Sequence, residues 1–107
     1  LSRAQASLLM QIRTNHIALN SYLHRFGRSD TPRCETCHEN GRGNREETLK
    51  HYLFECATYR WERGELDRKL GRDSRNLKTL LSTNKGIKAL LKYIGQTGRI
   101  KLYKGEV

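Results

Sequence analysis

Three cysteines and one histidine fall at a spacing that constrains this chain more than any other feature. Two residues separate Cys34 from Cys37, four separate His51 from Cys56, and the two pairs are thirteen residues apart. A two-residue gap lets one tight turn present two thiolates to the same ion, and zinc takes four nitrogen or sulfur ligands in a tetrahedron. The spacing therefore predicts one structural Zn²⁺ ion, held by Cys34, Cys37, His51 and Cys56.

The sequence leaves other uses of these side chains open. His38 can replace His51 as the fourth ligand, although ligands adjacent in the sequence strain a tetrahedral corner. The thiols can be small buried hydrophobic groups, or the C-x2-C pair can form a disulfide. An odd number of cysteines and their close spacing favour a metal in a reducing compartment over a disulfide. We expect His16 and His24 to be packing or surface residues.

Composition points to a small domain that needs reinforcement. The chain has 107 residues, of which only 36% are hydrophobic and 30% are charged. A core this thin is commonly supplemented by disulfides, a metal or a partner. We therefore expect one zinc-binding basic domain over residues 1–107. Its parts are an N-terminal helical segment (1–26), a zinc module (27–56) and C-terminal helices (57–107).

Apolar residues recur at helical spacing along most of the chain, which predicts a mainly α fold with a short turn or hairpin at the C-x2-C. Asn15 lies in a predicted helix break, since asparagine tolerates the left-handed conformation. Gly27, Gly71 and Gly98 are expected to end helices, and Asn84 to cap the last one. The predicted helices cover roughly residues 3–13, 16–25, 46–54, 58–70, 75–81 and 85–97.

The segment between the second and third predicted helices, residues 27–45, is rich in residues that form turns. Its Asn-Gly and Gly-x-Gly sequences favour a loop or a tight hairpin over a helix. In the last predicted helix, one apolar stripe is expected to be buried. Its members are Ile87, Leu90, Leu91 and Ile94.

The chain is strongly basic, with 21 Lys and Arg against 11 Asp and Glu and a formal charge of +10. Such a charge favours polyanionic partners, and the alternative is a basic protein that binds nucleic acid only non-specifically. Arginine adds bidentate geometry for phosphate. The candidate phosphate-binding residues are Arg25, Arg28 and Arg33 near the C-x2-C turn, Arg42 and Arg45 in the loop between the ligand pairs, and Lys85, Lys88 and Lys92 on one face of the last helix.

Aromatic side chains are candidate platforms for unpaired bases. At helical positions, Tyr59 and Trp61 are instead expected to lie in the core. Tyr103, in a polar tail, is expected to be exposed. The full set of candidates is Tyr22, Tyr52, Tyr59, Trp61, Tyr93 and Tyr103.

Nothing in the sequence is typical of an enzyme. It has no nucleophile elbow, phosphate loop or HExxH motif, and its acids do not form a set that would hold two metal ions. We expect this segment not to be an enzyme. Apolar runs are far shorter than the ~20 residues that cross a bilayer, and the N-terminus lacks the apolar region of a signal peptide. We expect a soluble protein without membrane contact, and Leu1 in place of Met favours an excerpt of a longer chain.

Three phrases resemble a known family. They are QIRTNHIALNSYLHRFGRSDTPRCETC (11–37), EETLKHYLFECATYRWER (46–63) and LKTLLSTNKGIKALLKYIGQTGRIK (77–101). Together they resemble the C-terminal end of the polyprotein of LINE-type non-LTR retrotransposons, especially fungal ones, where a similar segment follows the reverse transcriptase and often a ribonuclease H domain. Two departures are Asn15, where the family is expected to have glycine, and a longer loop at 39–45.

The resemblance implies a module that holds element RNA or target DNA near the polymerase during target-primed reverse transcription. It also implies that the enzymatic activities lie upstream, outside this chain, and we expect an intracellular, nuclear protein. One alternative is a domesticated or effector-like module, such as a host-taken or secreted effector protein, that binds another protein. A second is a structural cap that packs on the upstream reverse transcriptase or ribonuclease H domain through Leu8, Leu9 and Ile12.

Overall fold

Helices and short helical turns account for most of the computed structural model, which describes residues 3–43 and 45–100. The predicted mainly α class is confirmed: the described residues contain one isolated antiparallel bridge, between Arg33 and Glu46, and no longer strand pairing. In chain order the elements are α1 (Arg3–Arg13), α2 (Asn20–Arg25), α3 (Glu35–Glu39), the π-helical turn η1 (His51–Glu55), the 3₁₀ turn η2 (Ala57–Tyr59), α4 (Arg60–Leu70), the 3₁₀ turn η3 (Gly71–Arg75), α5 (Leu77–Ser82) and α6 (Asn84–Thr97).

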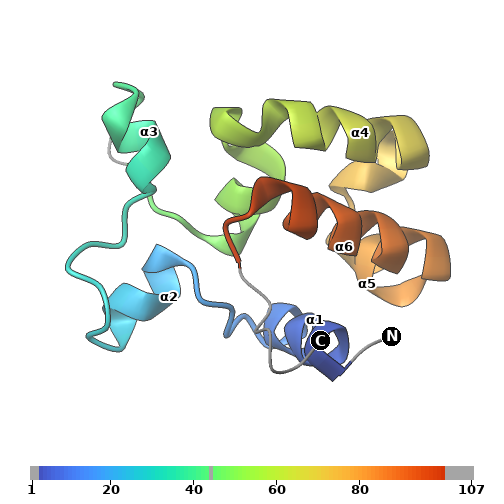
Figure 1. Ribbon diagram of the computed structural model, residues 1–107, viewed down its shortest axis with the longest axis horizontal. Helices are drawn as coiled ribbons and strands as arrows, with labels where there is room; N and C mark the ends of the chain where they lie inside the picture. The colour runs from blue at the N-terminus through green and yellow to red at the C-terminus, as the bar shows by residue number, and fades with distance from the viewer. Residues whose placement is uncertain (1–2, 44, 101–107) are drawn as a thin grey trace.

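The helices form two groups joined by the segment that contains η1 (Figure 1). Helix α6 packs against both α4 and α5, and η3 connects α4 to α5. Helices α2 and α3 lie on the other side of the molecule, and α1 lies below α6 in this view (Figure 1). In the described part of the chain, no helix has the length and apolar character needed to cross a bilayer.

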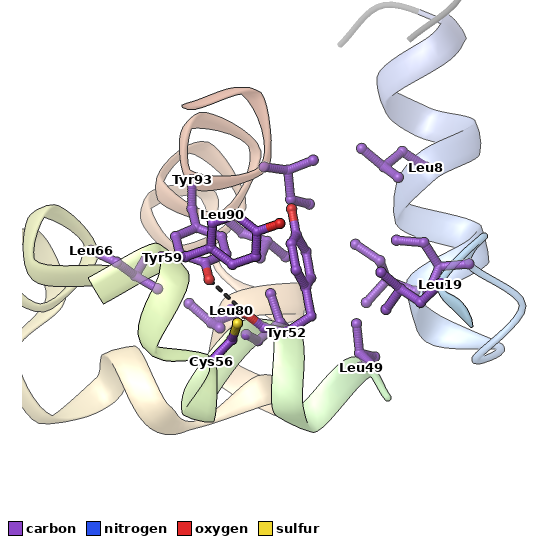
Figure 2. Close-up of a cluster of buried hydrophobic side chains, with 14 of the residues drawn as sticks. Leu8, Leu19, Leu49, Tyr52, Cys56, Tyr59, Leu66, Leu80, Leu90 and Tyr93 are labelled. Carbon is purple, nitrogen blue, oxygen red and sulfur yellow. Dashed lines mark hydrogen bonds between the residues drawn. The ribbon is translucent and has the colours of Figure 1, made fainter. Parts of the chain in front are cut away.

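The core forms where these groups meet, and Tyr52 is at its centre. Figure 2 shows its ring between Leu8 and Leu19 on one side and Tyr93 on the other. The Tyr93 hydroxyl donates to the Tyr52 carbonyl at 2.5 Å, and the two rings pack edge to face with their centroids 5.6 Å apart. A second edge contact, at 5.5 Å, joins Tyr52 to Tyr59. The segment that carries two predicted metal ligands is therefore fixed from both sides.

Helix α1 contributes its apolar stripe to this core. Leu8, Leu9 and Ile12 are each at most 3% exposed. Burying an aliphatic side chain of this size stabilises a fold by about 1.5–3 kcal/mol. These three side chains are therefore part of the interior of this chain and do not form the exposed apolar face that a cap on an upstream domain would need.

Several predicted helix ends are confirmed. Asn15 has a positive φ of 60°, which breaks the chain after α1. Gly27 (φ 72°), Gly71 (φ 60°) and Gly98 (φ 65°) follow α2, α4 and α6, and all three have a positive φ, which strains residues that carry a side chain. The predicted helix at 16–25 is wrong in its first residues, because α2 begins only at Asn20.

The cause of this late start is an alternation of buried residues before α2. Ile17 and Leu19 are both 1% exposed, whereas Ala18 between them is exposed. Residues two apart point to the same side when the backbone is extended, and not when it is helical. Leu19 is in fact extended (φ −98°, ψ 159°). The core contacts therefore override the helical spacing.

Three further boundaries differ from the predictions. Residues 46–48 are not helical, because Glu47 N–H donates to the Pro32 carbonyl at 2.8 Å beside the bridge at Glu46. The segment predicted as turns contains a short helix, α3, which begins directly after Cys34 and includes Cys37. The cap of α6 is Thr83 and not Asn84, since the Thr83 hydroxyl accepts the Gly86 N–H at 2.9 Å.

Gly86, in the first turn of α6, lies against the backbone of α5, and its replacement by alanine is expected to destabilise the domain. An added Cβ would lie 2.5 Å from the Thr79 carbonyl oxygen and 2.9 Å from the Leu80 Cα. Overpacking of this kind costs about 1–3 kcal/mol, more than the gain of about 1 kcal/mol in helix propensity. Gly95→Ala on the same helix is the control, since nothing lies within 4 Å of its Cβ position. Urea denaturation should show a loss for Gly86→Ala and none for Gly95→Ala, and equal effects would contradict the packing argument.

Candidate metal centre

The structure brings the four predicted ligands together in one buried cluster. Cys34 precedes α3, Cys37 lies within it, His51 begins η1 and Cys56 follows η1. All four side chains are at most 2% exposed. Their ligand atoms lie within 4.8 Å of one another, so the cluster can hold a metal ion.

The cluster presents three sulfurs and one imidazole nitrogen to a common point. Cys56 Sγ lies 3.8 Å from Cys34 Sγ and 3.7 Å from Cys37 Sγ. Cys37 Sγ lies 3.5 Å from His51 Nε2. All three cysteines are free thiols, so the disulfide alternative is wrong. His38 is exposed on α3 and is not part of the cluster.

Backbone hydrogen bonds bring the segment that contains Cys34 and Cys37 next to the segment that leads to His51 and Cys56. Cys34 N–H donates to the Arg45 carbonyl at 2.6 Å, next to the bridge between Arg33 and Glu46. Arg42 N–H donates to the Cys37 carbonyl at 2.8 Å. These bonds close the loop between the ligand pairs, and the chain then runs directly to His51.

The π-helical turn explains the four-residue gap between His51 and Cys56. Residues five apart in an α-helix point about 140° away from each other. In this chain the Cys56 N–H donates to the His51 carbonyl at 2.7 Å, a bond that spans five residues and widens the turn. Cys56 then leaves the turn with extended backbone (φ −67°, ψ 119°). The wider turn places both ligand atoms on the same side.

Two buried contacts from α4 hold this turn in place, and sequence reasoning missed them. The Arg63 side chain is 7% exposed. Its Nε donates to the Leu53 carbonyl at 3.1 Å and its Nη2 to the Cys56 carbonyl at 2.6 Å. These carbonyls lie at the end of the turn, where helical partners are lacking. Arg63 lies four residues after Tyr59 and three before Leu66, and this helical spacing, which neither Arg60 nor Arg68 has, is the signal that could have found it.

Hydrogen-bond donors surround the sulfurs. The Thr36 hydroxyl lies 3.3 Å from Cys34 Sγ and 4.0 Å from Cys56 Sγ, and accepts a bond from the Thr58 hydroxyl at 2.9 Å. Arg42 Nη1 donates to Thr58 Oγ1 at 3.0 Å and lies 3.9 Å from Cys37 Sγ. Donors around thiolates offset their negative charge. Arg42, a predicted phosphate ligand, thus faces the cluster.

The protonation of the metal-free cluster follows from its burial. Burial, with hydrogen bonds to Cys56 and Cys34, raises the pKa of the Cys37 thiol to about 11. For Cys56, burial acts to raise the pKa of the thiol. Hydrogen bonds, chiefly those with the Thr58 side chain and backbone, act in the opposite direction and outweigh burial, so the pKa is lowered overall. Burial and the charge of Arg45 lower the pKa of His51, which favours the neutral imidazole that binds metals. Metal binding must therefore displace protons from thiols.

The outer nitrogen of His51 faces an acid that the sequence analysis did not single out. Nδ1 is buried and, among the described residues, has no hydrogen-bond partner. Glu55 Oε1 lies 3.8 Å away and is itself 3.4 Å from Arg45 Nη2. Histidine ligands are usually oriented by a carboxylate or carbonyl on the nitrogen opposite the metal. The four-residue spacing from His51 to Glu55 is the signal that could have found this neighbour.

The basic residues predicted around the cluster are largely balanced by acids. Arg33 lies 3.4 Å from Glu35, and Arg45 lies 3.4 Å from Glu55. Over residues 27–56 the sequence has five Lys and Arg against six Asp and Glu. Of the other predicted cations, Arg25 and Arg28 are exposed at α2 and beyond it, and Lys85, Lys88 and Lys92 are exposed on α6.

The aromatic predictions are partly wrong. Tyr59 is 7% exposed, as expected for a core residue, but Trp61 is 81% exposed. The buried side of α4 carries Leu66, and five helical steps place Trp61 about 140° from it. Tyr52 and Tyr93 are buried at 1% and offer no surface to a base. Tyr103 lies outside the described residues.

Comparison with known proteins gives no relative for this arrangement. No protein-family model, no curated protein and no solved structure matches the chain. Its function is therefore inferred from the geometry and charge of its own side chains, together with the phrases quoted from its sequence.

Proposed function

We propose that Cys34, Cys37, His51 and Cys56 bind one Zn²⁺ ion with a structural role. With bonds of about 2.3 Å to sulfur and 2.0 Å to nitrogen, a tetrahedral zinc ion has edges of about 3.8 Å between two sulfurs and about 3.5 Å between sulfur and nitrogen. The corresponding distances in this chain are 3.8 and 3.7 Å for sulfur pairs and 3.5 Å for the mixed pair. This agreement along three edges supports zinc.

The donor set supports the same assignment. Thiolates with one imidazole suit zinc better than magnesium or calcium, which prefer oxygen. Four protein ligands also leave no coordination position for water or substrate. The ion would thus fix the fold around α3 and η1, and this segment would have no catalytic metal chemistry.

We propose that the domain binds the phosphate backbone of nucleic acid, and one observation carries this part of the proposal. Lys85, Lys88 and Lys92 follow one another at intervals of three and four residues on α6, all exposed. Such residues lie along one face of a helix. The helix contains no acid, and none of the three lysines has an ion-pair partner in the described part of the chain. We call these three residues the lysine face.

A fourth lysine extends this surface toward α4. Hydrogen bonding with Lys92, and the positive charge of Lys92, lower the pKa of Lys69. The two side chains line one cavity between α4 and α6, and the Glu62 and Glu65 side chains line it as well, so acids partly offset the positive charge at this end of the surface. Lysine is a point charge without the planar fork of arginine, so phosphate contacts from these lysines would position a backbone rather than read bases.

The lysine face lies on a rigidly packed element. The opposite side of α6 carries Leu90, Tyr93 and Ile94, each at most 2% exposed. In the setting that the sequence resemblance implies, this surface would hold element RNA or target DNA while an upstream reverse transcriptase acts on it. The wider setting is supported by the resemblance of the sequence phrases alone.

Replacing Lys85, Lys88 and Lys92 together by glutamine is expected to weaken nucleic-acid binding about 100-fold at ~0.1 M salt. Each phosphate contact contributes about 0.7–0.9 to the slope of log affinity against log salt, so the slope should fall by about 2 to 3. Fluorescence anisotropy of labelled single-stranded RNA and duplex DNA at several salt concentrations measures both quantities. Zinc content and thermal melting confirm that the variant is folded.

The matched control removes the same charge from the surroundings of the metal cluster. Arg33, Arg45 and Lys50 lie near Glu35 or Glu55, and their joint replacement by glutamine should change the slope by less than one. Equal losses in the two triple variants would show that binding follows net charge and not the lysine face. A folded, zinc-loaded protein that binds neither ligand at low salt would overturn the proposed function.

A further inference from the structure

Three aromatic rings line one face around α2. The ring centroids of His16 and Tyr22 are 5.6 Å apart, and those of Tyr22 and Phe26 are 4.8 Å apart, with interplanar angles of 42° and 47°. These are ordinary separations for packed aromatic rings. Phe26, however, is 57% exposed, and His16 is exposed as well. We call these three residues the α2 aromatic face.

A shallow cavity of about 70 Å³ opens beside Tyr22. Its apolar lining comes from Ile17, Leu19 and Leu49, which are at most 9% exposed. Polar groups also line it: Asn15, Ser21, Arg25 and Thr48. An apolar floor with a few polar groups suits the edge of a flat heterocycle that both stacks and accepts hydrogen bonds.

The charge around this cavity is positive. The first twenty-nine residues contain no Asp or Glu. Glu47 also lines the cavity, but its carboxylate accepts bonds from Arg99 at 2.7 and 2.6 Å. Arg25 lines the cavity and Arg28 lies beyond the end of α2. Both are exposed, and neither has an ion-pair partner in the residues that the structure describes.

We propose that the α2 aromatic face binds unpaired bases of single-stranded nucleic acid. A base would stack on Tyr22 or Phe26, and Arg25 and Arg28 would contact the adjoining phosphates. Aromatic rings next to cations are the means by which proteins bind single strands without regard to sequence. This inference rests on the proposed function and adds a strand preference to it: the lysine face suits any phosphate backbone, whereas the rings require bases that are free to leave a stack.

Trp61 supplies a contrast on the same molecule. It is the most exposed of the large hydrophobic side chains, at 81%. The cavity beside it, about 240 Å³, is lined by Glu62, Glu65 and Gln96. Two carboxylates at this position repel phosphate. The lining of this cavity contains no Lys or Arg, although Lys69 and Lys92 line a second cavity with the same Glu62, Glu65 and Gln96, so Trp61 is the comparison ring for the rings at α2.

The test is the joint variant Tyr22→Leu and Phe26→Leu, which keeps apolar volume and removes the rings. Stacking on each ring is worth roughly 5- to 100-fold in affinity, so binding of a labelled single strand should fall by at least about fivefold. Binding of a duplex of the same sequence should be unchanged. An oligonucleotide containing 2-aminopurine, whose fluorescence is quenched on stacking, should lose its quenching with this variant. Trp61→Leu should alter none of these quantities.

Other outcomes separate this inference from the proposed function. Equal losses on single strand and duplex, or no loss on either, would overturn the stacking proposal. If the lysine-face variant still lost affinity in that case, the proposed function would stand. If the unaltered protein bound neither the single strand nor the duplex, both the proposed function and the stacking proposal would be overturned. If the joint variant fails to melt cooperatively, Phe26→Leu alone repeats the test, since Phe26 is exposed and its ring contributes little to the core.

Discussion

Replacement of Cys56 by serine is expected to abolish binding of the proposed zinc ion and to unfold most of the domain. Cys56 Sγ lies within 3.8 Å of both other sulfurs, so its loss removes one of the four vertices of the proposed tetrahedron. Structural zinc contributes about 10–16 kcal/mol of apparent binding free energy in small domains. A native fold is stable by only about 5–15 kcal/mol in total. The remaining stability should therefore be near zero.

Zinc content by mass spectrometry and far-ultraviolet circular dichroism measure the two effects separately. A strong chelator added to the unaltered protein should reproduce the loss of helical signal. His38→Gln is the control, since His38 lies outside the cluster, and it should retain one ion and the original melting temperature. If Cys56→Ser lost the ion but melted like the unaltered protein, the metal would have no structural role.

The second large effect is expected for Glu47→Ala, which should cost about 3–5 kcal/mol of unfolding free energy. Glu47 is 3% exposed and accepts bonds from both Nε and Nη2 of Arg99 and from the Asn20 N–H at 2.7 Å. The Arg99 side chain is 26% exposed, so removing Glu47 leaves a partly buried guanidinium without its ion-pair partner, and removing one partner of a buried pair is strongly destabilising. Urea denaturation monitored by circular dichroism gives the difference.

An exposed ion pair provides the comparison. Glu65 lies 2.7 Å from Arg68 on α4, and both side chains are at least 40% exposed. Exposed pairs contribute about 0–1 kcal/mol because water screens them, so Glu65→Ala should change the unfolding free energy by no more than that. A loss for Glu47→Ala as small as that for Glu65→Ala would mean that Arg99 finds water or another partner when Glu47 is absent.

The metal ligands could be predicted from the sequence because a metal centre imposes short, local spacings. The gap between Cys34 and Cys37 reflects one turn, and the positive φ of Asn15 reflects the tolerance of one residue type. The mainly helical class and most helix ends depend on the same kind of local information. Whether the ion is zinc, and whether the chain belongs in a retroelement polyprotein, stay predictions.

What sequence reasoning missed depends on contacts between distant residues. Glu47 and Arg99 are 52 positions apart, and nothing near either residue indicates a partner. Trp61 is a different kind of miss, because local spacing separates it from Tyr59: Tyr59 lies seven residues from Leu66 and Trp61 lies five, and only the first spacing puts two side chains on one face of a helix. The extended backbone at Ile17 and Leu19 follows from the position of the core and not from the residues alone.

The bonds from Arg63 and Tyr93 to the turn around His51 have a thermodynamic consequence. They tie two of the four proposed ligands to α4 and α6, so that ion binding and the docking of these helices are linked equilibria. The coupling is reciprocal. If docking of the helices raises the affinity for the ion by a given factor, binding of the ion favours docking by the same factor. An ion at one end of the molecule and a polyanion along α6 could then strengthen each other's binding without touching.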